Sequence, residues 1–148
     1  MAGRTFHFPK WSLVEGDIRV DINLNRFEKQ YQDAQIYLDR EVMNGMKPYM
    51  PLRDGALVDL TTKRSAVYQG TGKVYAAYTP YGRFQYEGKI MVDPVTDLPW
   101  ARKGVKKVPT DEALTYSNPK ATPHWFDTAK NNHGQAWIRG VKRIAGGG

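Results

Sequence analysis

The stretch that most constrains the fold of this chain is Val74 to Gly88, which gathers aromatic residues around a proline and a glycine. Four of the nine tyrosines of the chain lie in it. Val74 to Thr79 alternates with a period of two, and Tyr, Val and Thr favour a half-buried pleated surface. Pro80 and Gly82 then break the alternation, because proline removes a ladder donor and glycine accepts a positive φ. The stretch therefore predicts two strands that meet at a corner.

The remaining strands are predicted on both sides of this corner. From Leu57 to Val92 the sequence predicts three or four strands, with a tight hairpin loop at Gly70-Thr71-Gly72. A short strand is predicted at Ile18 to Ile22, where apolar and charged residues alternate. Six residues are expected to build the corner itself and to be chiefly structural: Tyr75, Tyr78, Pro80, Tyr81, Gly82 and Tyr86.

Two amphipathic helices are predicted to pack on these strands. The first begins at Asn23 or Asn25, either of which can cap it, and ends near Asn44, just before Gly45. Apolar residues recur along it at steps of three or four, so one face should lie on the sheet: Leu24, Phe27, Tyr31, Ala34, Leu38 and Val42. The last helix is predicted to begin with Thr122 as its cap and Pro123 at its first position. Its apolar face consists of Phe126, Ala129, Trp137, Val141 and Ile144.

The expected fold is α+β: a bent antiparallel sheet of about four to five strands, one long helix packed across it, a C-terminal helix, and extended arms. A chain of 148 residues has the length of one domain. We expect an N-terminal arm and first strand over residues 1–23, and a single α+β domain over 24–148 with a long extended loop at 93–122. The arm lies on a neighbouring subunit or on the sheet, or is a frayed terminus.

The segment Asp93 to Thr122 contains four prolines and no sustained period. Loops of this length are generally functional or disordered. This one could hold DNA phosphates, bind a partner protein, or be a solvated insertion. We expect it to contact a neighbouring subunit or an adjoining ring, with Trp100 as the buried anchor. The candidate contacts with a partner or with DNA are Trp100, Arg102, Lys103, Lys106 and Lys107.

The composition narrows the class of partner. Lys and Arg number 22 against 15 for Asp and Glu, a net charge of +7. This charge favours an acidic partner, which could be nucleic acid, an acidic protein surface or a membrane, or it serves solubility alone. The chain has no cysteine, which excludes disulfides and thiol catalysis and suits a reducing cytoplasm. No apolar run approaches the length of a membrane span. We therefore expect a soluble protein without a membrane partner.

No constellation of residues in the sequence indicates catalysis or metal binding. His124 and His133 are nine residues apart, which places them on opposite faces of a helix. Asp93 and Asp97 lack the intervening ligand that a calcium loop needs, so they predict a surface turn. The serines lack the flanking glycines of a nucleophile elbow. We expect neither enzyme activity, nor a metal, nor a cofactor.

Three blocks of sequence occur in an order that is informative as a set. They are Pro48 to Leu57, Val74 to Gly88, and Asn118 to Lys130. Together they resemble the minor capsid or head-tail joining (tail-completion) proteins of tailed bacteriophages. In that family a long helix is followed by a Y-x-P-x-x-x-G-A-L turn, a tyrosine-rich strand corner and a final P-x-A-x-x-x-W-F-x-x-A-K helix. The residues through Asn23 and the stretch from Asp93 to Ser117 lie outside the matched blocks.

The resemblance implies a structural virion protein of the phage neck. Such a protein is a ring-forming subunit, usually hexameric in that family, which links the head connector to the tail around the DNA channel. Its partners would be copies of itself, the adjoining head-connector and tail proteins, and DNA that passes without being read in sequence. It would be assembled in the host cytoplasm and located in the virion at the head-tail junction.

The alternative function is a monomeric nucleic-acid-binding module that uses basic arms and tyrosines as a stacking platform. A stacking module should interleave its aromatic residues with basic ones. In and beside the stretch from Val74 to Gly88 the only basic residues are Lys73, Arg83 and Lys89. This spacing favours assembly over nucleic-acid stacking.

Overall fold

The computed structural model describes residues 11–15, 18–22 and 25–146 of the chain. Its elements are, in chain order, β1 (Trp11–Glu15), β2 (Ile18–Ile22), α1 (Asn25–Met46), the 3₁₀ turn η1 (Lys47–Tyr49), α2 (Ala56–Val67), α3 (Gly82–Glu87), β3 (Lys89–Val92), β4 (Val108–Ala113) and α4 (Trp125–Ile144). The predicted N-terminal arm before Trp11, the alternative helix start at Asn23, and Leu24 lie outside the described residues.

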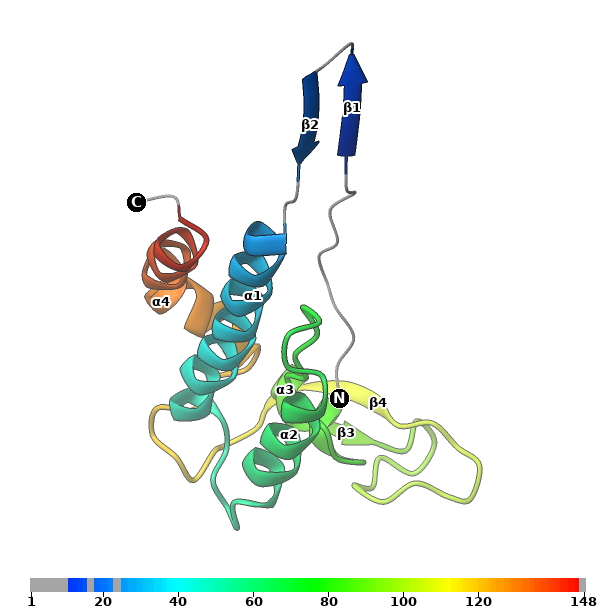
Figure 1. The fold of residues 1–148 in the computed structure, drawn as a ribbon. Coiled ribbons are helices and arrows are strands. Elements are labelled where there is room, and N and C mark those ends of the chain that lie inside the picture. The colour runs from blue at the N-terminus through cyan, green and yellow to red at the C-terminus, as the bar shows by residue number, and fades with distance from the viewer. Residues whose placement is uncertain (1–10, 16–17, 23–24, 147–148) are drawn as a thin grey trace.

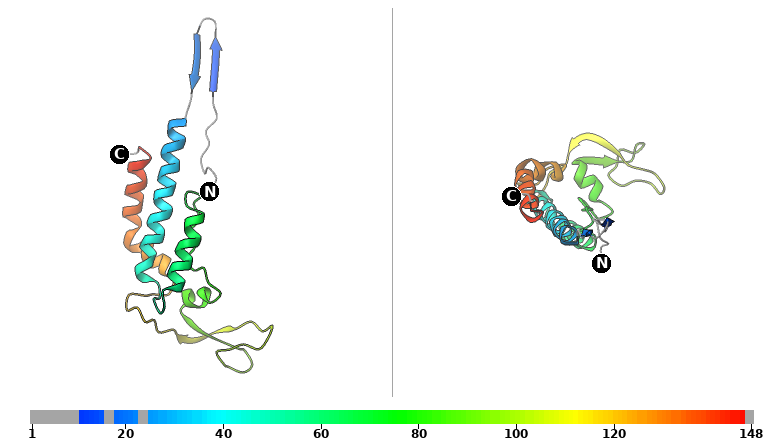
Figure 2. Two further views of the ribbon diagram at one scale, coloured as in Figure 1. Left: turned by 60° about the horizontal axis from the view of Figure 1, so that its bottom comes forward. Right: turned by 45° about the horizontal axis from the view of Figure 1, so that its top comes forward.

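Helices α1 and α4 lie side by side and form the body of the molecule (Figure 1). Helix α2 lies on another side of α1, as the two views of Figure 2 show. The β1–β2 hairpin lies beyond the N-terminal end of α1, whereas the β3–β4 hairpin lies near the other end of the helices (Figure 1). The fold is thus a helical body with a small two-stranded sheet at each end.

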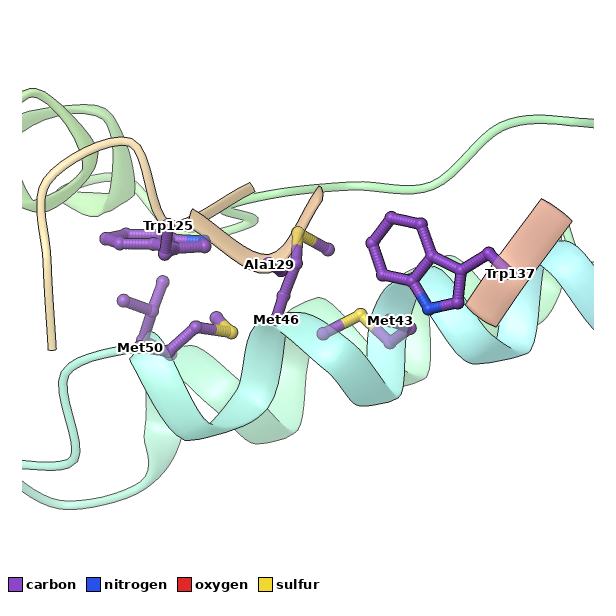
Figure 3. Packing of buried hydrophobic residues seen from close by; sticks show 7 residues of the cluster. Met43, Met46, Met50, Trp125, Ala129 and Trp137 are labelled. Atoms are coloured by element: carbon purple, nitrogen blue, oxygen red, sulfur yellow. The ribbon is translucent and has the colours of Figure 1, made fainter. Parts of the chain in front are cut away.

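The hydrophobic core lies between α1, α4 and the start of α2 (Figure 3). Its buried members are Met43, Met46, Met50, Leu57, Trp125, Ala129 and Trp137. Methionine fills irregular gaps between bulky neighbours because its side chain is unbranched and flexible. Trp125 is fully buried, and its indole N–H donates a hydrogen bond of 2.8 Å to the carbonyl of Ala76. The core tryptophan therefore also fastens the irregular segment before α3.

The predicted bent sheet of four to five strands is wrong. Among the described residues the strands form two separate antiparallel pairs, β1 with β2 and β3 with β4. The strand at Ile18–Ile22 is confirmed, but its partner is β1, with Trp11 opposite Ile22. Strand β4 lies within the segment for which the sequence predicts an extended loop, and it pairs with β3 across a bulge.

The first helix is confirmed over Asn25–Met46, but the prediction that it packs on a sheet is wrong. It packs against α4 and α2 instead. Phe27 and Tyr31, two members of the predicted apolar face, are 47% and 38% exposed. Met43 and Met46 near its C-terminal end, and Met50 just beyond it, are buried in one cluster with residues of α4.

Residues 56–67 form a helix where the sequence predicts strands. The buried face of α2 consists of Leu57, Thr61 and Ser65, each four residues after the last. Because two of these three side chains are polar, the helical period does not show as an apolar pattern. The helix start is set by Asp54, whose Oδ1 accepts the N–H of Ala56 at 3.0 Å.

The predicted strand corner is also wrong, because Val74 to Thr79 bonds to α2 and not to a neighbouring strand. The N–H of Tyr75 donates to Ser65 Oγ at 3.0 Å, and that of Tyr78 donates to Thr61 Oγ1 at 2.9 Å. Buried hydroxyl groups of α2 thus replace the strand that a period of two predicts.

After the corner, the predicted second strand is in part a helix. Pro80 and Tyr81 precede α3, Gly82 begins it, and Tyr86 lies inside it. Tyr86 packs edge-on against Trp125 with ring centroids 4.7 Å apart, so it has the structural role expected of it. Tyr78 and Tyr81, by contrast, are 43% and 44% exposed.

The buried carboxylate of Asp39 joins α1 to the end of α2. Its Oδ2 accepts the backbone N–H of Gly70 at 2.7 Å and of Gly72 at 3.0 Å, and its Oδ1 accepts Gln35 Nε2 at 2.8 Å. Both glycines have positive φ, of 91° and 80°. The predicted hairpin loop at this position is therefore wrong, and the glycines form the exit from α2.

The last helix begins later than predicted. Its first residue is Trp125, preceded by His124 at a φ of 49°, and not Pro123 after a Thr122 cap. The Thr122 hydroxyl contacts that of Thr128 at 2.8 Å, and its N–H donates to the carbonyl of Tyr49. Thr122 therefore fastens the approach to α4 instead of capping it.

The close approach of α1 and α4 gives a stability test on two glycines of one helix. A Cβ at Gly140 would collide with the ring of Tyr37, whereas a Cβ at Gly134 would have only Lys130 Cγ nearby, at 3.7 Å. We expect Gly140→Ala to lower the free energy of unfolding by about 1–3 kcal/mol through overpacking. Gly134→Ala should raise it by about 0.5–1 kcal/mol, because alanine is the better helix former. Urea unfolding measures both, and a Gly140→Ala protein as stable as the wild type would contradict the close packing.

Candidate partner-binding loop

Strands β3 and β4 are joined by residues 93–107, which we call the tip loop. It projects away from the helices in all three views (Figures 1 and 2). Every residue predicted from the sequence to contact a partner or DNA lies in it: Trp100, Arg102, Lys103, Lys106 and Lys107. Its shape is set by one residue at its base.

That residue is Asp93, whose side chain is completely buried. Its Oδ1 accepts the N–H of Val95 at 2.8 Å and of Thr96 at 3.3 Å, while its Oδ2 accepts the N–H of Arg102 at 3.1 Å. The guanidinium of Arg102 adds a two-pronged contact, with Nε 2.9 Å from Oδ2 and Nη2 3.3 Å from Oδ1. The sequence predicted a surface turn here, but the carboxylate is the buried centre of the turn.

The electrostatics follow from this geometry. The guanidinium of Arg102 holds the pKa of the Asp93 carboxyl well below its usual range, and the backbone N–H donors act in the same direction. Burial acts against them. The Asp93 carboxylate in turn raises the pKa of the Arg102 guanidinium. The carboxylate is therefore ionised at neutral pH, and each of its oxygens has partners.

The tip loop presents large apolar side chains to solvent. Val95 is 70% exposed and Trp100 is 67% exposed. Lys103 and Lys106 are also exposed, and neither forms an ion pair with any residue that the structure describes. Lys107 lies 5.7 Å from the ring centroid of Phe84, within its own chain. Of the predicted contact residues, Trp100, Lys103 and Lys106 thus face outward, whereas Arg102 and Lys107 already have partners.

A second cluster of aromatic and basic side chains lies at the end of α2. The Arg64 Cζ atom is 5.1 Å from the ring centroids of both Tyr68 and Tyr78, and Lys73 Nζ is 4.7 Å from that of Tyr68. These are cation–π distances. Lys73, and to a lesser extent Arg64, lower the pKa of the Tyr75 hydroxyl.

Sequence reasoning missed Arg64 in this cluster, because it precedes the tyrosine-rich stretch by ten residues. The available signal was the spacing of Arg64 and Tyr68, which places them on one side of a helix once α2 is recognised. In the folded protein, Arg64 therefore lies beside the tyrosine-rich stretch, in addition to the basic residues that adjoin this stretch in the sequence.

Within residues 11–15, 18–22 and 25–146, no three side chains of His, Asp or Glu gather as a metal site would require. No helix in these ranges is long and apolar enough to cross a membrane. The chain matches no protein-family model, no curated protein and no solved structure. The function is therefore inferred from the residues and geometry of this chain alone.

The Asp93 contacts predict a loop that loosens when its carboxylate is changed. We expect Asp93→Asn to speed hydrogen exchange at the amides of Val95, Thr96 and Arg102, because an amide side chain cannot accept all of their bonds and leaves Arg102 unpaired. Asp97→Asn is the matched control, since its side chain is exposed and asparagine tolerates the same positive φ.

The same contacts predict a dependence on pH. The pKa of Asp93 is depressed in the folded state, so its stabilising contribution is complete above its unfolded pKa of about 3.9 and is lost as pH falls below that value. Between about pH 5 and pH 2 the wild type should lose stability more steeply than Asp93→Asn. Parallel acid unfolding curves for the two proteins would contradict this role.

Proposed function

We propose that this protein is a structural virion protein of the phage neck, a ring-forming tail-completion or head-tail joining subunit that links the head connector to the tail around the DNA channel. The observation that carries the proposal is the tip loop, in which the buried Asp93 carboxylate, paired with Arg102, shapes a turn that presents an exposed tryptophan outside the body. A loop fixed before binding loses little entropy on association, and tryptophan is one of the residues enriched at binding hot spots. The three ordered sequence blocks support the same class.

The basic residues fit a protein that surrounds DNA without reading it. Lys103 and Lys106 extend from the tip loop without acidic partners among the described residues, and the chain carries a net charge of +7. Contacts of lysine with phosphate oxygens are independent of sequence and weaken with salt. Such contacts would suit DNA that moves through a channel.

The monomeric nucleic-acid-binding module is kept as a second candidate because of the cluster at the end of α2. Arg64 and Lys73 lie over the rings of Tyr68, Tyr75 and Tyr78, which gives the mixture of aromatic and basic groups that a stacking platform uses. The side-chain cations of Arg64 and Lys73 cover the ring faces on which nucleobases would stack. This competition favours assembly as the main function.

Complementation of a phage that lacks the gene tests the assembly function. The triple variant Trp100→Ala, Lys103→Glu, Lys106→Glu should fold normally but leave DNA-filled heads and complete tails unjoined, as seen by electron microscopy. The matched control removes one exposed apolar residue and two exposed bases from α4: Ile138→Ala, Arg139→Glu, Lys130→Glu. It should restore joining. Normal titre without the gene, or from the triple variant, would contradict the proposal.

Titration with a single-stranded oligonucleotide tests the second candidate. If the protein is an assembly subunit, Tyr75→Ala and Tyr78→Ala should leave its weak, salt-sensitive binding unchanged. If it is a stacking module, each substitution should weaken binding by about 1–3 kcal/mol, the usual worth of one stacked base. A loss of that size would replace the assembly proposal with the alternative.

A further inference from the structure

We propose that the tip loop of one copy inserts Trp100 into a groove on the next copy, so that subunits associate head to tail. The inference rests on the proposed function and names the surface to which the tip loop binds. It follows from two features at opposite ends of the β3–β4 hairpin. One is the exposed apolar tip, and the other is an open groove with apolar walls.

The groove lies where the start of α2, the start of α3 and the chain after β4 meet. Its volume is about 730 Å³, within the range of pockets that enclose drug-sized molecules and therefore ample for an indole ring. Its apolar walls are formed by Pro51, Leu57, Tyr81, Leu114 and Tyr116. The Tyr116 hydroxyl donates a 2.6 Å hydrogen bond to the carbonyl of Gln85, which fixes one wall against another.

The tip loop does not lie in the groove of its own chain. The loop leaves the hairpin where Val92 pairs with Val108, whereas the groove residue Leu114 follows the opposite end, where Lys89 pairs with Ala113. The N–H of Leu114 donates to the carbonyl of Gly88 at 2.9 Å, which keeps the groove at that end. A strand rises roughly 3.3 Å per residue, so the length of β4 separates the two features.

In the proposed contact the tip of one copy binds the groove of another, so the contact joins two different surfaces. An interface of this kind leaves a tip free at one end of a dimer and a groove free at the other. Further copies add in the same way until the series closes into a ring or continues as a filament. A contact between two tips or two grooves would stop at a dimer.

The charges of the two surfaces are partly complementary. The exposed bases Lys103 and Lys106 follow Trp100 in the tip loop, which also carries the exposed Asp97, while Asp54 lines the groove beside Arg53. Two more exposed acids, Asp111 and Glu112, lie on β4 just before the groove. Because these groups are exposed, their attraction is screened by salt.

Sedimentation velocity of the full chain tests the contact with two variants. Trp100→Ala removes the anchor, and Thr115→Arg places a long charged side chain in the groove at an exposed position. Each alone should associate at least about 30-fold more weakly than the wild type, the loss expected of a binding hot spot. An equimolar mixture of the two should form a one-to-one dimer and nothing larger, because one intact tip meets one intact groove.

The other outcomes overturn the inference. Self-association of Thr115→Arg like the wild type would indicate tip-to-tip contact, and the same result for Trp100→Ala would indicate another interface. A mixture that stays monomeric, or a wild-type chain that is monomeric at its highest soluble concentration, would show that no such contact forms. Leu60→Ala, an exposed substitution on α2, is the control and should not change association.

Failure of this inference and failure of the proposed function give different results. If the tip and groove variants self-associate as the wild-type protein does, yet loss of the gene leaves heads and tails unjoined, the neck function stands and the contact is wrong. If the mixed variants form the dimer but virions lack the protein, the contact stands and the neck function is wrong.

Discussion

The arrangement of the chain after α2 depends on the hydrogen bonds accepted by Asp39. This carboxylate is buried, and a buried charge without partners would cost far more than most single contacts contribute. It is satisfied by the N–H groups of Gly70 and Gly72, so α2 can end only where those groups reach α1. That end point in turn sets where the segment from Val74 lies against α2, and so where Trp125 finds the carbonyl of Ala76.

Elsewhere too, side chains form hydrogen bonds with backbone N–H and C=O groups. They do so because the described residues form only two small two-stranded sheets in which the backbone could pair. Thr61 and Ser65 accept N–H groups from the irregular segment before α3, and Asp93 accepts three in the tip loop. Asn118 donates from its amide to the carbonyls of Pro48 and Met50. Backbone polar groups must be paired when they leave water, and side chains are the partners available where no neighbouring strand exists.

These pairings explain which parts of the fold the sequence predicts. Helix α1, which is 22 residues long, was predictable because apolar residues recur at helical spacing along most of it, as was the short strand β2 with its clean alternation. Helix α2 was not, since its buried face is mostly hydroxyl groups, and the period-two pattern after it reflects packing on that helix. The tip loop was found from its composition, but the pairing of Asp93 with Arg102 spans nine residues and exists only once the loop closes. The groove draws on three distant segments, which no local pattern joins.

The way the tip loop is held has a consequence for how such a protein can change over generations. Its shape comes from Asp93, Arg102 and backbone amides, and none of its exposed apolar residues belongs to the hydrophobic core. Mutations at Val95, Leu98 or Trp100 therefore leave the folding of the helical body untouched. A lineage can alter its recognition surface one residue at a time, keeping pace with an altered partner, while selection on the core continues unchanged.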